Sequence, residues 1–162
     1  MKTLLLLRHA KSSWDNAGLT DYNRPLNDRG RRDAPRMGKL IRREGLTPNL
    51  MLSSSAKRAA TTAELVALEF SLTSEIRYTE SLYLAEPETY IVLARQVSDD
   101  IESIMMVGHN PGIQELVEWL TGQDERMATA TLAYIRAPIQ KWSELAGGKQ
   151  YELAGIWRPR EL

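Results

Sequence analysis

Each of the two histidines of the chain follows an apolar run, and the residue types around them suit a site that binds an anion. Arg8 and His9 follow directly after four leucines near the amino terminus, and His109 follows a second apolar run that ends at Gly108. A guanidinium keeps its charge at any working pH, and a neutral imidazole is a nucleophile near pH 7. The Arg8-His9 pair therefore indicates an anion-handling site, although a solvated strand end would leave the same pair.

A third polar stretch lies between a short apolar run and a helical pattern. A short apolar run, residues 50–52, follows Asn49. Ser53, Ser54 and Ser55 separate this run from a helix that is expected to begin at about Ala56 and to carry Arg58 in its first turn. Hydroxyls and free backbone amides at a helix amino end bind anions. Ser53 is therefore a candidate phosphate ligand, although serines in this position are also ordinary helix caps.

These three stretches need strands and helices that bring them together. Apolar runs at 4–7, 50–52 and 104–107 predict buried parallel strands, and apolar residues at helical spacing follow each of them. Further strands are expected at 76–78, 129–137 and 153–157, and a third helix from about Pro87. Strands alternating with helices predict an α/β fold, a three-layer α/β/α sandwich with a mostly parallel central sheet. The carboxyl ends of such strands open on one crevice.

The segment after the first strand is less regular. Residues 14–28 are rich in Asp, Asn, Gly and Pro and predict a long surface loop, after which Asn27 or Asp28 caps a helix that ends near Gly45. Pro35 conflicts with that helix because proline removes a hydrogen bond and clashes with the preceding turn. Either the helix is kinked or it begins later than the capping residues suggest.

Length and composition predict one domain over residues 1–162. The chain has 21 basic and 21 acidic residues, no cysteine, and no apolar segment long enough for a signal peptide or a bilayer span. We therefore expect a cytoplasmic protein that has no nucleic-acid or membrane partner and forms no disulfides. A crowd of arginines between Arg24 and Arg43 is either a solvated helix face or a surface that docks an acidic partner.

The order of the motifs resembles the histidine phosphatase superfamily, the group that includes phosphoglycerate mutases and acid phosphatases. Residues 7–10 (Leu-Arg-His-Ala) resemble its opening signature, 53–64 its second arginine block and 108–112 its second histidine block. Residues 24–30 are similar to the segment that precedes the family's first helix. The short length, and residues 8–14 in particular, resemble the SixA-type phosphohistidine phosphatases. The resemblance implies a phosphoglycerate mutase-like fold.

The resemblance also assigns roles to residues. It implies that His9 is the nucleophile that becomes phosphorylated, that Arg8, Arg58 and His109 surround the phosphoryl group, and that no cofactor is needed. Ser12 and Ser53 join the candidate phosphate ligands. A catalytic zinc site instead of this chemistry would need three protein ligands, and two nearby arginines would repel the cation. Phosphoryl transfer itself needs mainly positioning and fixed positive charge.

The general acid is the weakest part of the match. Glu80 resembles the family's acid position, but Ser81 replaces the basic residue that commonly follows it. A phosphorylated imidazole demands less from an acid than an alkoxide does, so this departure favours phosphohistidine substrates. The competing hypotheses are a small-molecule phosphomonoesterase, which would act on a small phosphate ester, and a phosphate-binding module without catalysis.

The expected partner is a phosphorylated protein, for example a histidine phosphotransfer domain. The chain has little spare length for the lid that covers the pocket in larger relatives, so we expect an open crevice. Residues 14–28 and 80–87 folded over that crevice would contradict this expectation.

Overall fold

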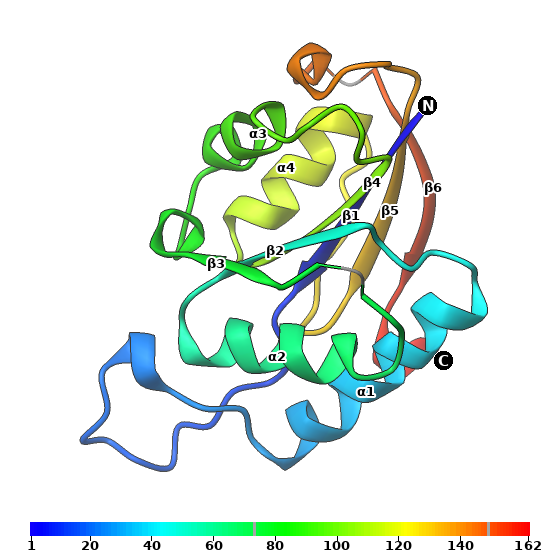
Figure 1. The fold of residues 1–162 in the computed structure, drawn as a ribbon. Coiled ribbons are helices and arrows are strands. Elements are labelled where there is room, and N and C mark those ends of the chain that lie inside the picture. Colours follow the sequence, from blue (N-terminus) through cyan, green and yellow to red (C-terminus); the bar gives the residue numbers. More distant parts are fainter. Residues whose placement is uncertain (73, 149) are drawn as a thin grey trace.

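The strands of this protein form one mixed sheet, which the computed structural model in Figure 1 shows at the centre of the molecule. The structure describes residues 1–72, 74–148 and 150–162, and in them six strands lie in the order β3-β2-β4-β1-β5-β6. The neighbouring strands from β3 to β1 in this order are parallel to each other. Strand β5 is antiparallel to β1, and β6 is antiparallel to β5. The strands are β1 (Lys2–Arg8), β2 (Leu50–Ser54), β3 (Arg77–Thr79), β4 (Ser103–Gly108), β5 (Leu132–Ala137) and β6 (Glu152–Trp157).

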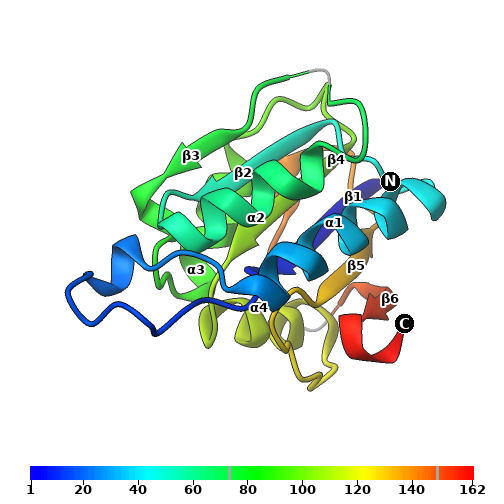
Figure 2. The same ribbon diagram turned by 90° about the horizontal axis from the view of Figure 1, so that it is seen from below.

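Helices cover both faces of the sheet, which confirms the predicted three-layer α/β/α sandwich. The helices are α1 (Asp28–Arg43), α2 (Lys57–Ala67), α3 (Pro87–Arg95) and α4 (Gly112–Thr121). Helices α1 and α2 pack together on one face, and α3 and α4 on the other, as Figures 1 and 2 show from two sides. Short 3₁₀ helices occur at Asp21–Asn23, Glu80–Leu82, Trp142–Glu144 and Pro159–Glu161. In the described residues, no helix is long and apolar enough to cross a membrane.

Strand β1 lies in the interior of the sheet, and its side chains contribute to both hydrophobic cores. Leu4 and Leu6 pack in the core beneath α3 and α4, and Leu5 and Leu7 in the core beneath α1 and α2. Each of the four leucines is at most 1% exposed. At roughly 2 kcal/mol for each buried leucine, this burial anchors the strand that leads into Arg8 and His9.

Helix α1 begins where the capping residues predict and continues through Pro35. The Asn27 side chain accepts a hydrogen bond from the Gly30 amide, and Pro35 lies inside the helix. The alternative that the helix begins later than its capping residues suggest is therefore wrong. Pro35 cannot donate to the carbonyl of Arg31, but Arg31 lies on the exposed face, where water can satisfy that carbonyl. Strand β5 begins at Leu132, so the predicted strand over residues 129–137 is three residues too long at its start.

The close approach of α1 to the segment after β1 depends on Gly30. A Cβ at this position would lie 2.2 Å from the Lys11 carbonyl oxygen, which accepts a hydrogen bond from the Asn27 amide. Alanine is the better helix former by about 1 kcal/mol, so without this contact the substitution would stabilise α1. The glycine therefore sets the distance between the helix and the loop that carries the site.

We predict that Gly30→Ala lowers the free energy of unfolding by about 1–3 kcal/mol, because the new methyl group overlaps main-chain atoms that cannot move aside freely. Urea denaturation of the wild type, Gly30→Ala and the exposed control Arg32→Ala measures this difference. Unchanged or increased stability of Gly30→Ala would contradict the packing described here.

Candidate active site

The carboxyl ends of β1 and β4 place the two histidines of the chain side by side. Arg8 pairs with Gly108 in the parallel register, so His9 and His109 each follow the last paired residue of their strand. Their ring centroids lie 5.1 Å apart. His9 is 6% exposed and His109 is 1% exposed. The parallel pairing of β1 and β4 thus brings His9 and His109 together, as expected for neighbouring strand ends.

A hydrogen bond to the main chain determines the tautomer of His9. Its Nδ1 lies 2.7 Å from the carbonyl oxygen of Ala10. A carbonyl can only accept, so Nδ1 carries the proton and Nε2 keeps the lone pair. The Ala10 amide in turn donates to the Thr62 hydroxyl at 3.0 Å, and this hydroxyl donates to the Arg58 carbonyl at 2.7 Å. Thr62 therefore links the His9 segment to α2.

The two predicted arginines border the same crevice. Arg8 donates from Nη1 to the Met127 carbonyl at 3.1 Å, and its buried Nε has no hydrogen-bond partner among the described residues. Arg58, 4% exposed, donates from Nη1 to the Asp21 carbonyl at 2.7 Å and from Nη2 to the Asp21 carboxylate at 3.0 Å. Burial lowers the pKa of Arg8, and the charge of Arg58 lowers it further.

Asp21 gathers three donors around one carboxylate. Besides Arg58, the Tyr83 hydroxyl donates to it at 2.5 Å and Arg24 Nη1 at 2.8 Å. The Tyr83 hydrogen bond and those from Arg24 and Arg58 lower the pKa of Asp21 to about 2, against a smaller opposing effect of burial. Asp21 is therefore ionised at neutral pH and neutralises part of the arginine charge.

His109 is held by a serine at the end of β2. Its Nε2 lies 2.8 Å from the Ser54 hydroxyl, which also accepts a hydrogen bond from the Ala56 amide at 3.2 Å. The Nδ1 of His109 is buried and has no hydrogen-bond partner in the described part of the chain. A buried polar atom without a partner is costly in an isolated protein. Such an atom beside a crevice is suited to contact a bound group.

Burial and the surrounding positive charges keep both imidazoles neutral. Burial lowers the pKa of His9 well below its ordinary value of 6.5. The hydrogen bond to the Ala10 carbonyl opposes this shift, and the charges of Arg58 and Arg8 add to it. The pKa of His109 is lowered to about 4, mainly by burial and then by Arg58. The site therefore combines uncharged imidazoles with charged guanidiniums at neutral pH.

A solvent-open cavity of about 410 Å³ unites most of the predicted residues. Arg8, His9, Ser12, Arg58 and His109 line it, as do Asp21, Arg24 and Trp14. The cavity lining does not include Ser53 or Glu80.

The two residues outside this lining have other environments. Ser53 is buried in β2, and its hydroxyl donates to the Ser54 carbonyl at 2.9 Å. The serine whose hydroxyl contacts His109 is Ser54. Glu80 is exposed in the 3₁₀ helix after β3, and the interactions at this wall of the crevice come from Tyr83 instead.

Sequence reasoning missed Asp21 and Tyr83, and from the serine stretch 53–55 it selected Ser53 and not Ser54. Asp21 stands three residues before Arg24, a spacing that allows an ion pair, but many loop pairs share that spacing. Alternation along a strand turns Ser53 and Ser54 to opposite faces, which separates the two serines but does not tell which face holds the site. Tyr83 is a tyrosine in an irregular segment, and only the tertiary structure places it against Asp21.

The loop 14–27 and the segment after β3 meet each other, which the sequence did not predict. The Asp21–Tyr83 hydrogen bond joins them, and the Tyr22 and Tyr83 rings pack edge to face with centroids 5.0 Å apart. Both segments form a wall of the cavity, yet Trp14 remains 73% exposed and Leu84 53% exposed at its rim. In Figure 1 the loop projects away from the sheet at lower left. The crevice is accordingly walled on this side and open to solvent.

Together these groups define an α/β protein whose crevice suits an oxyanion. Two guanidiniums can bind oxygens bidentately, and a neutral imidazole with a defined lone pair stands beside them. In the described residues, no group of three or more Asp, Glu or His side chains is arranged to hold a metal ion. The chemistry that such a donor set serves best is the binding and transfer of a phosphoryl group.

Comparison with known proteins identifies the family. The sequence model of the histidine phosphatase superfamily (branch 1) matches residues 4–83. An uncharacterized protein of Mycobacterium leprae (strain TN) is 31% identical over 96% of this chain and 92% of its own length. The chain therefore belongs to the histidine phosphatase superfamily, and this membership supports a phosphatase of the hydrolase class.

Solved structures agree with this assignment. A SixA from Agrobacterium tumefaciens, described as a candidate phosphohistidine phosphatase, has a TM-score of 0.84 and 28% identity, with 98% of each chain covered. The protein histidine phosphatase SixA complexed with tungstate has the same fold, with a TM-score of 0.83 at 19% identity and 98% of each chain covered. The expected phosphoglycerate mutase-like fold of SixA type is confirmed.

We predict that neither histidine protonates near pH 6.5, because burial and the neighbouring guanidiniums lower both pKa values. NMR of the two imidazole Hε1 signals from about pH 3 to pH 8 measures this directly, and only two signals need assignment. His109 should titrate near pH 4 and His9 should stay neutral well below pH 6.5. A midpoint between about 6 and 7 for either ring would contradict the electrostatics of the site.

Proposed function

We propose that this protein is a metal-independent phosphohistidine phosphatase that uses His9 as its nucleophile and acts on phosphohistidine displayed by a partner protein, such as a histidine phosphotransfer domain. The observation that carries the proposal is the hydrogen bond from His9 Nδ1 to the Ala10 carbonyl. It leaves the Nε2 lone pair on a residue that lines the crevice with Arg8 and Arg58.

The reaction has two steps. In the first, the His9 Nε2 lone pair attacks phosphorus, the phosphorus–nitrogen bond of the substrate breaks, and the substrate imidazole leaves with a proton from solvent. In the second, water attacks the phosphorus atom on His9, the bond between phosphorus and Nε2 breaks, a proton is released, and inorganic phosphate and free His9 result. Arg8 and Arg58 bind the equatorial oxygens as charge spreads over them, and the unpartnered Nδ1 of His109 lies at the same crevice.

The absence of an acid at the described crevice residues supports phosphohistidine over an ester. Asp21 is the carboxyl group that lines the crevice, and its pKa of about 2 leaves it without a proton to donate. Glu80, the acid that the family resemblance suggested, lies outside the cavity lining. An alkoxide needs a proton from a general acid as it leaves, whereas an imidazole leaves more readily.

The open rim supports a protein as the carrier of the phosphate. Trp14 is 73% exposed and stacks on the Arg24 guanidinium, with the Cζ atom 3.3 Å from its ring centroid. Leu84 is 53% exposed across the same cavity. An open rim with these two exposed side chains leaves a partner protein free to approach the crevice.

We predict that the wild type releases phosphate from a phosphohistidine protein in single turnover and cleaves a simple alkyl phosphate, whose alkoxide needs a proton as it leaves, slowly or not at all. His9→Ala should reduce phosphohistidine turnover more than about a thousandfold, as removal of a nucleophile does. Glu80→Gln, an exposed substitution outside the crevice, should retain wild-type turnover.

Two outcomes would contradict this account. Fast ester cleavage that falls in Glu80→Gln would identify a phosphomonoesterase with Glu80 as its acid. Tight binding of the phosphoprotein without release of phosphate would identify a phosphate-binding module.

A further inference from the structure

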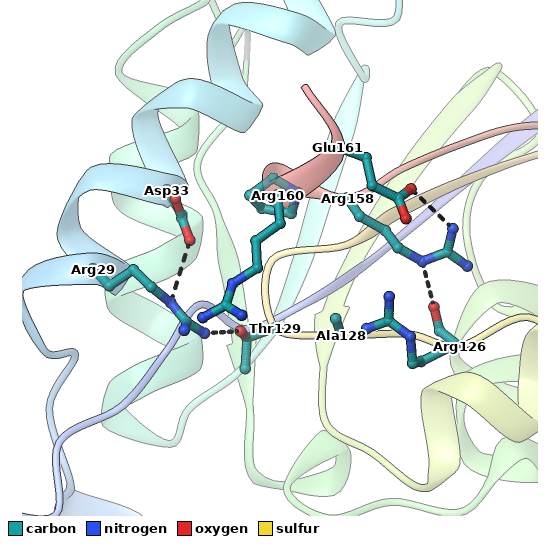
Figure 3. Close-up of a pocket in the computed structure, with 9 residues that line it drawn as sticks. Arg29, Asp33, Arg126, Ala128, Thr129, Arg158, Arg160 and Glu161 are labelled. Atoms are coloured by element: carbon teal, nitrogen blue, oxygen red, sulfur yellow. Dashed lines mark hydrogen bonds and ion pairs between the residues drawn. The ribbon is translucent and has the colours of Figure 1, made fainter.

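A second cavity, of about 250 Å³, lies next to the crevice and is rich in arginine. We call it the arginine pocket, and Figure 3 shows its lining residues: Arg29, Asp33, Arg126, Ala128, Thr129, Arg158, Pro159, Arg160 and Glu161. They come from α1, from the segment between α4 and β5, and from the carboxyl-terminal segment after β6. Three regions far apart in sequence thus contribute four guanidiniums to one small space.

Two of the four guanidiniums are held by the protein itself. Arg158 pairs with Glu125 at 2.8 Å and with Glu161 at 3.3 Å. Arg29 donates to the Thr129 hydroxyl at 3.1 Å and lies 3.8 Å from the Asp33 carboxylate. These contacts fix the walls of the pocket.

The other two guanidiniums are available to a ligand. Arg126 and Arg160 are exposed, and in the described parts of the chain neither side chain forms an ion pair. In Figure 3 the Arg160 side chain extends from the terminal segment toward Arg29 and Thr129. Like charges that share a small cavity repel each other, and a bound anion relieves that repulsion.

The arginine pocket adjoins the catalytic crevice through a short piece of main chain. Thr129 lines both cavities. The Met127 carbonyl accepts the hydrogen bond from Arg8, and the Ala130 amide lies 3.0 Å from the His9 carbonyl. When the phosphoryl group of a substrate lies at His9, other groups of the same substrate can therefore enter the neighbouring arginine pocket.

We propose that the arginine pocket is a subsite for a carboxylate of the phosphorylated partner protein, a glutamate or aspartate close to the phosphohistidine. This inference rests on the proposed function. Arg126 and Arg160 make the new ion pairs, while Arg29 and Arg158 shape the pocket. A carboxylate suits the pocket better than a second phosphate, because Asp33 and Glu161 already offset part of its charge and would repel a dianion.

Two synthetic phosphohistidine peptides test this subsite, one with glutamates beside the phosphohistidine and one with glutamines at the same positions. For the wild type, the glutamate peptide should have the lower KM. In Arg126→Ala/Arg160→Ala, the KM of the glutamate peptide should rise about fivefold with little change in kcat, the size expected for the loss of exposed ion pairs. The difference should shrink at about 0.5 M salt, which screens such pairs.

Arg42→Ala is the matched control, because Arg42 is an exposed arginine of α1 outside the pocket lining. Equal KM values for the two peptides in the wild type, or an equal KM increase for both peptides in the double variant, would overturn the subsite. A KM increase in Arg42→Ala as large as in the double variant would also overturn it, in favour of general charge attraction. Failure of the wild type to dephosphorylate either peptide would instead contradict the proposed function.

Discussion

The hydrogen bond between His9 Nδ1 and the Ala10 carbonyl is the interaction on which the site depends. It leaves a buried imidazole with one defined lone pair, which the proposed nucleophile requires, and it needs the main chain after β1 to stay fixed. The buried leucines of β1, the Thr62 hydroxyl and the tight approach of Gly30 to Lys11 all serve that requirement. Burial then completes the effect, because it lowers the pKa of His9 and keeps the ring neutral.

Charge in the crevice is balanced rather than simply positive. Arg8, Arg58 and Asp21 line the same space, and the Asp21 carboxylate accepts a hydrogen bond from Nη2 of Arg58. In the proposed reaction, an incoming phosphoryl group would compete with Asp21 for that guanidinium, and Tyr83 and Arg24 would remain as partners for the displaced carboxylate. The arginine pocket continues the positive charge beyond Thr129. This arrangement connects the chemistry proposed at His9 with the surface that the proposed protein substrate would contact.

The sequence predicted those parts of the site that strands deliver directly. The apolar runs before Arg8 and His109 fix the strand ends, so the meeting of the two histidines follows from parallel-sheet geometry. Loop residues were harder, because the contacts of Asp21 and Tyr83 depend on how two irregular segments pack. The structure places Ser54 and not Ser53 against His109, because adjacent residues of a strand face opposite sides, and the sequence does not say which side holds the crevice. Pro35 was tolerated because Arg31 faces solvent.

Trapping the phosphorylated enzyme tests the central claim most directly. Rapid mixing with a labelled phosphohistidine protein, quenching with base and mapping the label by peptide digestion locates the phosphate. The account predicts an acid-labile phosphate on His9 in the wild type and none in His9→Ala. Label on another residue, or turnover by the wild type through a label-free path that His9→Ala retains, would contradict it.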